Sequence, residues 1–222
     1  MDSVGEILSF LNTQNPSPEL IAVSKTKSSE EIRMAYGKGL RRFGENRVQE
    51  LLRKREELQD LPIRWHFIGS LQSNKVNAIV GNVELFHALE SIKIFRKISA
   101  AGLKLNKATP SLIQVNISRE AQKSGILPED LEAFCRSIQK ESNPYCPILG
   151  LMCIGSSLEW AGVNKVKEEF EEMHRLFRSL SFFEEIDFNM KFLSMGMSSD
   201  FRLAVKCGSN MIRVGQAIFG AR

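Results

Sequence analysis

The segment Leu20-Ile21-Ala22-Val23-Ser24-Lys25-Thr26-Lys27 is a short apolar run that ends in a lysine. The run is too short for a helix of its own, and its aliphatic, partly β-branched residues suit a strand that is buried on both faces. Strands of that kind belong to parallel sheets that are covered by helices. We therefore predict a parallel α/β fold in which Lys25 ends a core strand.

Lys25 would lie at the rim of this predicted core, half-shielded from water. Burial disfavours the charged ammonium form, and a second cation two residues on, Lys27, disfavours it further. A lysine whose pKa is lowered in this way attacks carbonyl groups and forms Schiff bases. Taken alone, the segment favours a simpler interpretation, a rim lysine whose ammonium extends into solvent, so other parts of the chain must decide.

Strand-like and helix-like segments alternate along the rest of the chain. Strand candidates lie at residues 20–24, 42–46, 65–69, 85–89, 112–117, 148–154, 192–197 and 211–215. Helix candidates lie between them at residues 28–39, 48–58, 70–80, 91–105, 128–140, 164–180 and 199–206. Strict alternation predicts a parallel sheet with helices outside it. Eight such units predict a (β/α)₈ barrel, at the short end of the usual range of roughly 200 to 400 residues. An open, doubly wound sheet is the alternative.

The whole chain, residues 1–222, is predicted to form one domain, because it contains no linker, low-complexity tract or close internal repeat. The stretch 4–11 is apolar at helical spacing and is expected to cover the N-terminal mouth of the barrel. With no second domain to complete a shared site, we expect a monomer.

Composition excludes several classes of function. Hydrophobic residues make up 43% and charged residues 25% of the chain, a globular balance that argues against disorder. The net charge of +4 is not gathered into a Lys/Arg stripe with interleaved aromatics, so nucleic-acid binding is not indicated, whereas a small anionic ligand is compatible with it.

Cysteine and histidine spacing indicates neither a zinc site nor a disulfide framework, because no CxxC occurs and the three histidines are scattered. No apolar run approaches the roughly 18 residues that span a membrane. The first residues are acidic rather than basic, unlike a signal peptide. We therefore expect a cytoplasmic protein with reduced thiols.

In a (β/α)₈ barrel, reactive residues lie at the C-terminal ends of the strands. The polar residues at those predicted ends are Lys25, Glu45, Asn46, His66, Glu90, Asn116, Ser198, Arg213 and Gln216. Lys25 is thus predicted to lie where the chemistry of this fold takes place.

The last two strand-to-helix turns predict a phosphate site. Residues 194–200 and 213–220 are rich in Gly and Ser, and the loops after strands seven and eight are the usual phosphate site of this architecture. Glycine allows close backbone approach, unpaired N–H groups at a helix start bind anions, and Ser198 and Ser199 add hydroxyl donors. Each turn alone is better explained by helix capping, with Gly215 relieving a tight turn. Two such turns in adjacent loops, opposite a strand-end lysine, favour phosphate.

A lysine Schiff base together with a phosphate site indicates pyridoxal 5′-phosphate more than any other common cofactor. Arg213 would then point toward the pyridine nitrogen, to which an arginine donates but which it cannot protonate. An unprotonated ring is a weaker electron sink, which suits cofactor binding or restricted proton transfer better than decarboxylation. The alternative is an ion pair between Arg213 and Glu45 across the rim.

Several motifs resemble those of one family, the YggS/PROSC group of pyridoxal phosphate homeostasis proteins. The matching segments occur in the family's order from about residue 20 to the C-terminus. They are residues 22–27, Phe43-Gly44-Glu45-Asn46 with 48–50, Trp65-His66-Phe67-Ile68-Gly69 with 71–75, 114–118 with Lys123-Ser124-Gly125, 150–152, Gly196-Met197-Ser198, and 212–215 with 217–220.

The resemblance implies a barrel like the N-terminal domain of alanine racemase, with Lys25 holding the cofactor as an internal aldimine. It also implies that Ser198 and Gly215 contact the phosphate and that Arg213 contacts the ring nitrogen, with Asn46 and His66 near the ring. Members of the group are thought to buffer or deliver the cofactor without turnover of their own.

The sequence departs from the family pattern at three places. Gln216 stands where Thr is common, so its backbone N–H must serve the phosphate. Arg47 stands where an aromatic residue is common, and residues 152–156 are less rich in proline than in relatives.

Three functions remain open from the sequence. The first is a carrier that passes the cofactor to dependent enzymes, supported by the placement of Tyr36 and Tyr145 on a helix or loop, away from any racemase-like site. The second is a weak amino-acid racemase, with His66 or Lys27 as the second proton relay. The third is a Schiff-base aldolase whose substrate carries the phosphate. Two motif lysines, Lys75 and Lys123, are candidates for a second cofactor site, although solvated surface charges explain them better.

Overall fold

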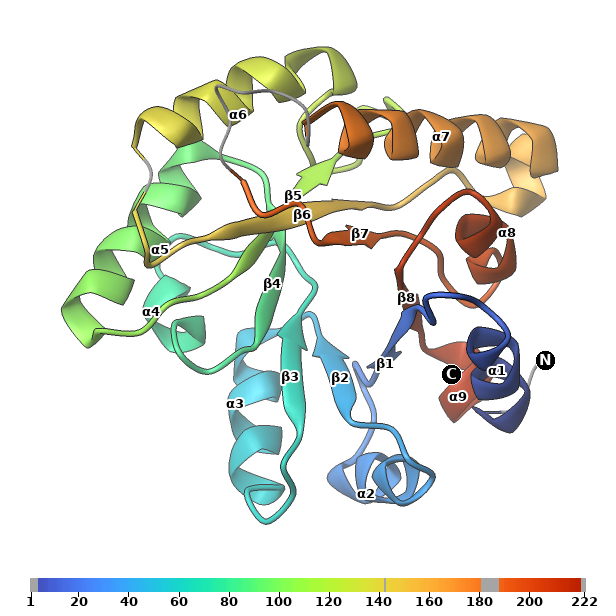
Figure 1. Cartoon of the computed structure of the whole chain (residues 1–222). Coiled ribbons are helices and arrows are strands. Elements are labelled where there is room, and N and C mark those ends of the chain that lie inside the picture. Colours follow the sequence, from blue (N-terminus) through green and yellow to red (C-terminus); the bar gives the residue numbers. More distant parts are fainter. Residues whose placement is uncertain (1–3, 142, 181–187, 221–222) are drawn as a thin grey trace.

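The computed structural model describes residues 4–141, 143–180 and 188–220, and its centre is a closed barrel of parallel strands (Figure 1). The strands are β1 (Glu19–Val23), β2 (Arg42–Glu45), β3 (Arg64–Phe67), β4 (Leu85–Leu89), β5 (Ser111–Val115), β6 (Ile148–Cys153), β7 (Phe192–Ser194) and β8 (Met211–Val214). Each strand pairs with the next, and β8 closes the ring on β1, with Leu20 opposite Ile212. The barrel prediction is confirmed, and the open sheet is wrong because β1 and β8 are paired.

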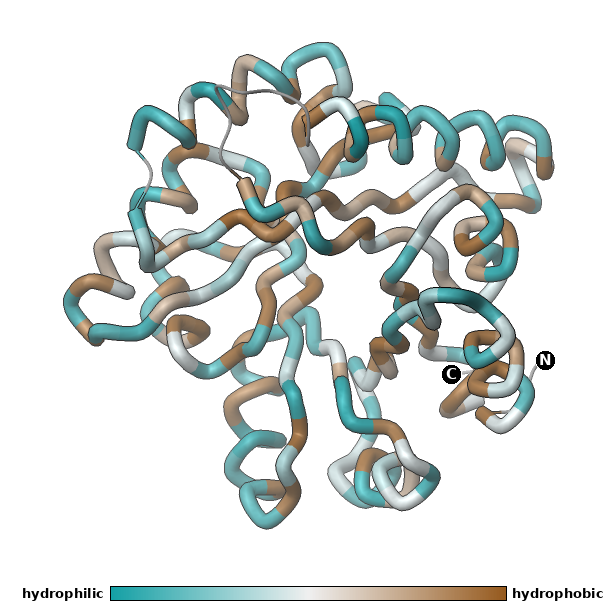
Figure 2. Tube along the Cα trace, in the orientation of Figure 1, coloured by the Kyte–Doolittle hydropathy of each residue, from teal (hydrophilic) through white to brown (hydrophobic). Residues whose placement is uncertain are grey.

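Helices surround the barrel on its outside (Figure 1). They are α1 (Val4–Asn12), α2 (Ser29–Gly37), α3 (Val48–Glu57), α4 (Val76–Ile79), α5 (Ile92–Leu105), α6 (Leu131–Lys140) after the short 3₁₀ turn Pro128–Asp130, α7 (Leu158–Leu180), α8 (Phe201–Lys206) and α9 (Gln216–Phe219). The hydrophilic colour in Figure 2 runs along the outward turns of α6 and α7, whereas every residue of β4, β5 and β8 is buried. The helices therefore cover a barrel whose strands are buried on both faces, as parallel strands usually are.

Helix α1 does not cover the mouth of the barrel. Its buried residues Ile7 and Leu11 form an apolar cluster with Phe201 of α8 and with the outward residues Ile212 and Val214 of β8. This position completes the ring of helices beside β8, where the final helix α9 has only four residues. The prediction that the N-terminal stretch covers the mouth was therefore wrong.

Two predicted helices have different bounds. The stretch 70–80 is helical only over α4, because residues 73–75 form a turn in which the Lys75 N–H bonds the Gln72 carbonyl. Ser and Asn residues such as those at 73 and 74 compete with helical hydrogen bonds and favour turns. Helix α7 starts earlier than predicted, at Leu158, and is interrupted at Gly162, where φ is +77°.

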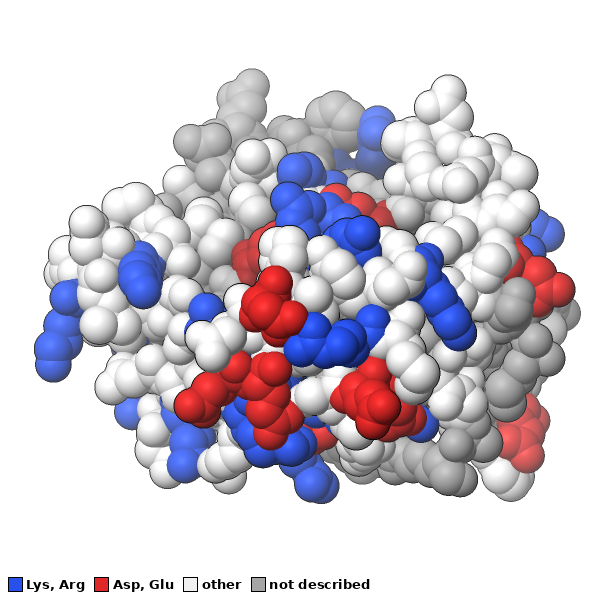
Figure 3. Space-filling view, turned by 90° about the horizontal axis from the view of Figure 1, so that it is seen from below, with Lys and Arg blue, Asp and Glu red and all other residues white. Residues whose placement is uncertain are grey.

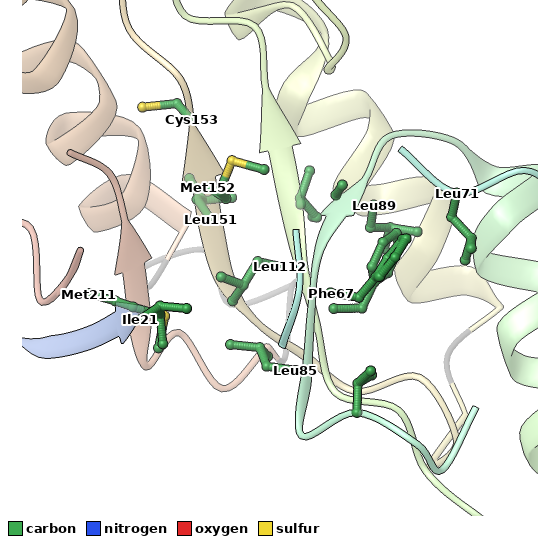
Figure 4. Packing of buried hydrophobic residues seen from close by; sticks show 14 of the residues in the cluster. Ile21, Phe67, Leu71, Leu85, Leu89, Leu112, Leu151, Met152, Cys153 and Met211 are labelled. Carbon is green, nitrogen blue, oxygen red and sulfur yellow. The ribbon is translucent and has the colours of Figure 1, made fainter. Parts of the chain in front are cut away.

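Buried apolar side chains fill much of the barrel interior below the mouth. Figure 4 shows Ile21 of β1 beside Met211 of β8, with Leu112 of β5 and Leu85 of β4 directed at the same space. All four side chains are at most 2% exposed. Side chains from strands far apart in sequence thus fill the barrel, which leaves the C-terminal mouth as the place for a site.

Helix α2 begins with a capping box that supports the turn after β1. The Ser28 hydroxyl accepts from the Glu31 N–H, and the Glu31 carboxylate accepts from the Ser28 N–H. We expect Ser28→Ala to lower the free energy of unfolding by about 1 kcal/mol. Urea denaturation measures this. The comparison is Ser29→Ala, which removes an exposed hydrogen bond to Glu57 and should cost less, and a loss in Ser28→Ala no larger than in Ser29→Ala would contradict a specific role for the cap.

Lys and Arg side chains are interspersed with Asp and Glu on the face of the molecule that Figure 3 shows. Within the described ranges, no helix has both the length and the apolar character needed to cross a membrane.

Candidate functional site

The end of β1 directs Lys25 into the C-terminal mouth of the barrel. Side chains alternate between the two faces of a strand, and Ile21 lies opposite the inward residue Arg213 of β8. Ile21, Val23 and Lys25 therefore face the barrel axis, whereas Ser24 faces the helices. Lys25 is half-buried, which agrees with its predicted place at the rim of the core.

A cavity with two lobes occupies this mouth. A large lobe of about 410 Å³ and a small lobe of about 340 Å³ share Val23, Lys25, Met197 and Arg213. Together they have the size of a typical small-molecule site. The large lobe is further lined by Asn46, Ile68, Gly69, Ser70, Gln114, Asn116, Lys123, Ser124 and Ile154. The small lobe is further lined by Ser198, Ser199, Gly215 and Gln216.

Arg213 is held firmly at the wall common to both lobes. The side chain is 4% exposed, and its guanidinium donates to the Ser194 hydroxyl (2.6 Å) and to the Cys153 carbonyl (2.8 Å). Burial lowers the pKa of Arg213 from its ordinary value. The alternative pairing with Glu45 is wrong, because Glu45 faces outward and binds Lys54 at 2.8 Å.

His66 lies beneath the cavity instead of in its lining. Its Nδ1 is 2.9 Å from Nε2 of His87, and Nδ1 of His87 is 3.2 Å from the Ser194 hydroxyl that Arg213 contacts. Burial, with minor effects of the Arg42 and Arg64 charges, lowers the pKa of His66 to about 3. Burial also lowers the pKa of His87 well below its ordinary value, helped by the nearby His66 and Arg213. Both rings are therefore neutral and reach the site only through Ser194.

The small lobe offers a hydroxyl and backbone N–H groups. The Gly215 N–H donates to the Ser198 hydroxyl at 3.2 Å. A Cβ on Gly215 would lie 3.2 Å from the Val23 carbonyl oxygen, so glycine allows this turn to pack tightly on β1. Ser198 does not cap α8. The N-cap residue of this helix is Asp200, whose carboxylate accepts from the Met197 N–H. The capping alternative for Ser198 is therefore wrong.

The large lobe is closed on one side by residues 116–126, which fold back over the mouth. The Asn116 side-chain amide donates to the carbonyls of Glu120 and Lys123, and the Gln114 amide donates to the Ser124 carbonyl. Gln114 and Ser70 were not among the predicted site residues, although Gln114 stands two places before Asn116 and so shares its inward face.

The two motif lysines behave differently. Lys123 lines the large lobe, and its ammonium binds the Glu120 carboxylate and the Gly155 carbonyl. Lys75 stands at the start of α4 and does not line either lobe. Lys27, a candidate proton relay, donates to the Phe219 carbonyl and pairs with Glu31, also outside the lining.

The two tyrosines lie away from the cavity. Tyr36 is at the end of α2, where Arg41 stacks on its ring at 4.0 Å, and Tyr145 precedes β6. These positions are at the opposite end of the strands from Lys25. Neither tyrosine can contribute a proton at the mouth in this arrangement.

Comparison with known proteins agrees with this geometry. A family model described as the alanine racemase N-terminal domain matches residues 8–222. The pyridoxal phosphate homeostasis protein of Aquifex aeolicus is 40% identical over 205 residues, which are 92% of this chain and 87% of that protein. Its counterpart in Helicobacter pylori J99 is 39% identical over 203 residues, 90% of this chain and 86% of that protein. The solved structure of PipY from Synechococcus elongatus PCC7942 with PLP bound is 35% identical, with a TM-score of 0.85, over 97% of this chain and 99% of that chain. By sequence and by fold, the chain belongs to the pyridoxal phosphate homeostasis proteins, within the family of the alanine racemase N-terminal domain.

Proposed function

We propose that this protein binds pyridoxal 5′-phosphate and buffers it or delivers it to enzymes that depend on it, without catalytic turnover of its own. The observation that carries this proposal is one cavity onto which Lys25, the buried Arg213 and the Ser198–Gly215 pair converge. These groups offer an amine, a fixed cation and anion-binding donors, which together fit the aldehyde, ring and phosphate of this cofactor.

Each lining group has a proposed part. The Lys25 amine would hold the cofactor covalently through its aldehyde group, with loss of water. Arg213 would donate to the ring nitrogen, and Asn46 would line the space beside the ring. Ser198, Gly215 and the backbone N–H of Gln216 hold the phosphate. Because residue 216 is glutamine where threonine is common in the family, the site has one hydroxyl contact fewer to the phosphate. His66 acts at a distance, through His87 and Ser194, on the orientation of Arg213.

The composition of the lining supports a carrier over an enzyme. When bound, the cofactor supplies an electron-accepting ring, but racemisation also needs a second acid or base at the substrate carbon. Among the described residues that line the two lobes, the ionisable side chains are Lys25, Lys123 and Arg213. Lys123 already binds Glu120 and Gly155, and an arginine does not give up its proton.

The deciding experiment treats cofactor-free protein with pyridoxal phosphate, reduces it with borohydride and maps the adduct by peptide mass spectrometry. One cofactor per chain, attached to Lys25 after reduction, is the expected result, and an unreduced sample should release its cofactor into excess hydroxylamine. A protein that takes up no cofactor would overturn the proposal and favour the Schiff-base aldolase. Repeated conversion of one alanine enantiomer into the other would overturn the non-catalytic part and favour the racemase.

Arg213 gives a quantitative check on the proposed ring contact. We expect Arg213→Gln to weaken cofactor binding about tenfold, because one charge-assisted hydrogen bond at a buried site is lost. Absorbance titration measures the dissociation constant, and Arg202→Gln on the outer helix α8 is the control. An unchanged dissociation constant in Arg213→Gln would show that the guanidinium does not bind the cofactor.

We further propose that residues 1–222 act as one domain and as a monomer in the cytoplasm. The four cysteines are buried free thiols in this structure, which suits a reducing compartment. Burial raises the pKa of Cys153 to about 12, so that its sulfur is an unreactive neighbour of Arg213.

A further inference from the structure

A buried lysine stands directly behind the turn that carries Lys25. Lys54 of α3 is 0% exposed, and lysine is almost never fully buried unless it is paired. Its ammonium donates to the Ser24 carbonyl (2.8 Å), to Glu45 (2.8 Å) and to Glu50 (2.7 Å). All three protons of the ammonium thus have an acceptor.

The same two carboxylates hold the residues on either side of Lys25. The Ser24 hydroxyl donates to Glu45 at 2.5 Å, and the Thr26 backbone N–H donates to Glu50 at 2.7 Å. Thr26 has a φ of +67°, the left-handed region that a β-branched residue rarely adopts. Such a conformation persists only where its surroundings impose it. Here the bond to Glu50 fixes the Thr26 N–H.

The charges of Lys54, Glu45 and Glu50 depend on one another. Burial raises the pKa of Glu45, opposed by the hydrogen bonds from Lys54 and Ser24. Burial also acts to raise the pKa of Glu50, but the bond and charge of Lys54 and the Thr26 N–H bring it below its ordinary value. Removing the Lys54 ammonium would leave two neighbouring carboxylates uncompensated, one of them fully buried.

We propose that Lys54 is a positioning residue for Lys25: through Glu45 and Glu50 it clamps Ser24 and Thr26, so that the Lys25 amine faces the cavity. This inference rests on the proposed role of Lys25. The group lies on the helix side of β1 and β2, outside the cavity lining, so it acts on the site only through the backbone.

The test compares Lys54→Met and Glu50→Met with Glu50→Gln, which keeps an oxygen for the Thr26 N–H. The matched control is Arg42→Met, because Arg42 pairs with Glu19 across the same two strands at their opposite ends. Circular dichroism first confirms that each variant is folded at the working temperature. Hydrogen exchange of residues 24–27 is then measured in cofactor-free protein, and the dissociation constant for pyridoxal phosphate is measured by absorbance.

We expect exchange at Thr26 to become at least tenfold faster, and cofactor binding at least tenfold weaker, in Lys54→Met and Glu50→Met. Glu50→Gln should recover most of both losses, and Arg42→Met should stay within twofold of the wild type. The inference is overturned if the folded Lys54→Met and Glu50→Met variants keep wild-type exchange and affinity. If Lys54→Met does not fold, Glu50→Met decides, because Glu50 is only partly buried.

A failure of the proposed function would give a different experimental result from a failure of the role proposed for Lys54. Wild-type protein that forms no borohydride-stable adduct on Lys25 would overturn the proposed function. Exchange at Thr26 in the cofactor-free variants would still decide whether Lys54 clamps the turn.

Discussion

Replacing Lys25 with alanine should abolish the borohydride-stable adduct and lower the affinity for pyridoxal phosphate by about 100-fold, or ~3 kcal/mol. The covalent bond requires an amine that faces the shared part of the cavity, and Lys25 is the lysine common to both lobes. Arg213 and the small lobe remain in place, so weak non-covalent binding should persist. Absorbance titration and intact-mass measurement after reduction give the two numbers.

Lys27→Ala is the matched control for this experiment, since it removes the same side chain two residues along the same turn. The Lys27 ammonium pairs with Glu31 and donates to the Phe219 carbonyl, outside the cavity lining. The control should therefore keep the adduct on Lys25 and an affinity within a few fold of the wild type. An adduct that survives in Lys25→Ala and disappears in Lys27→Ala would reverse the assignment.

The order of strands and the barrel were predictable because strand-like and helix-like segments alternate strictly along the chain, and most of the strands are short apolar runs. The errors arose where local pattern was compatible with two structures. Apolar spacing in α1 showed that one face is buried, but not that this face packs on β8 and α8. Likewise, Ser70 has the sequence features of a helix cap, yet it lines the large lobe and the helix begins at Val76.

The structure places most of the predicted strand-end residues in the lining of the cavity, and the exceptions differ in depth or in the face of the strand. Asn46 lines the cavity, whereas its predicted neighbour Glu45 turns outward to Lys54, because adjacent side chains on a strand point in opposite directions. His66 faces the barrel axis but lies below the residues that line the cavity. The burial of Lys54 could not be foreseen. The spacing of Glu50 and Lys54 shows one ion pair on the helix, but nothing local shows that Glu45 of β2 and the Ser24 carbonyl also meet the ammonium.

The second large expected effect is a loss of stability at acidic pH, which arises from the pair His66 and His87 beneath the site. An arginine only donates hydrogen bonds, so the Ser194 hydroxyl accepts from Arg213 and gives its own proton to Nδ1 of His87. Nε2 of His87 then carries a proton and donates to Nδ1 of His66. Each ring is therefore neutral, with a fixed tautomer, and an added proton would break the chain that orients Arg213.

The sign of the pH dependence follows from these lowered pKa values. Unfolded protein takes up a proton on His66 below about pH 6.5, whereas the folded protein does not until about pH 3, so stability falls as the pH falls between these values. For His66 alone, the free energy of unfolding should be about 2 kcal/mol lower at pH 5.0 than at pH 7.5. His87 adds a loss of the same sign.

Urea denaturation at the two pH values measures the difference, and His66→Leu should remove the share that belongs to His66. His174→Gln, a change between α7 and α8 on the outside of the barrel, should keep the full wild-type loss. Equal losses in the wild type and in His66→Leu would mean that the buried pair is not what makes the fold sensitive to acid.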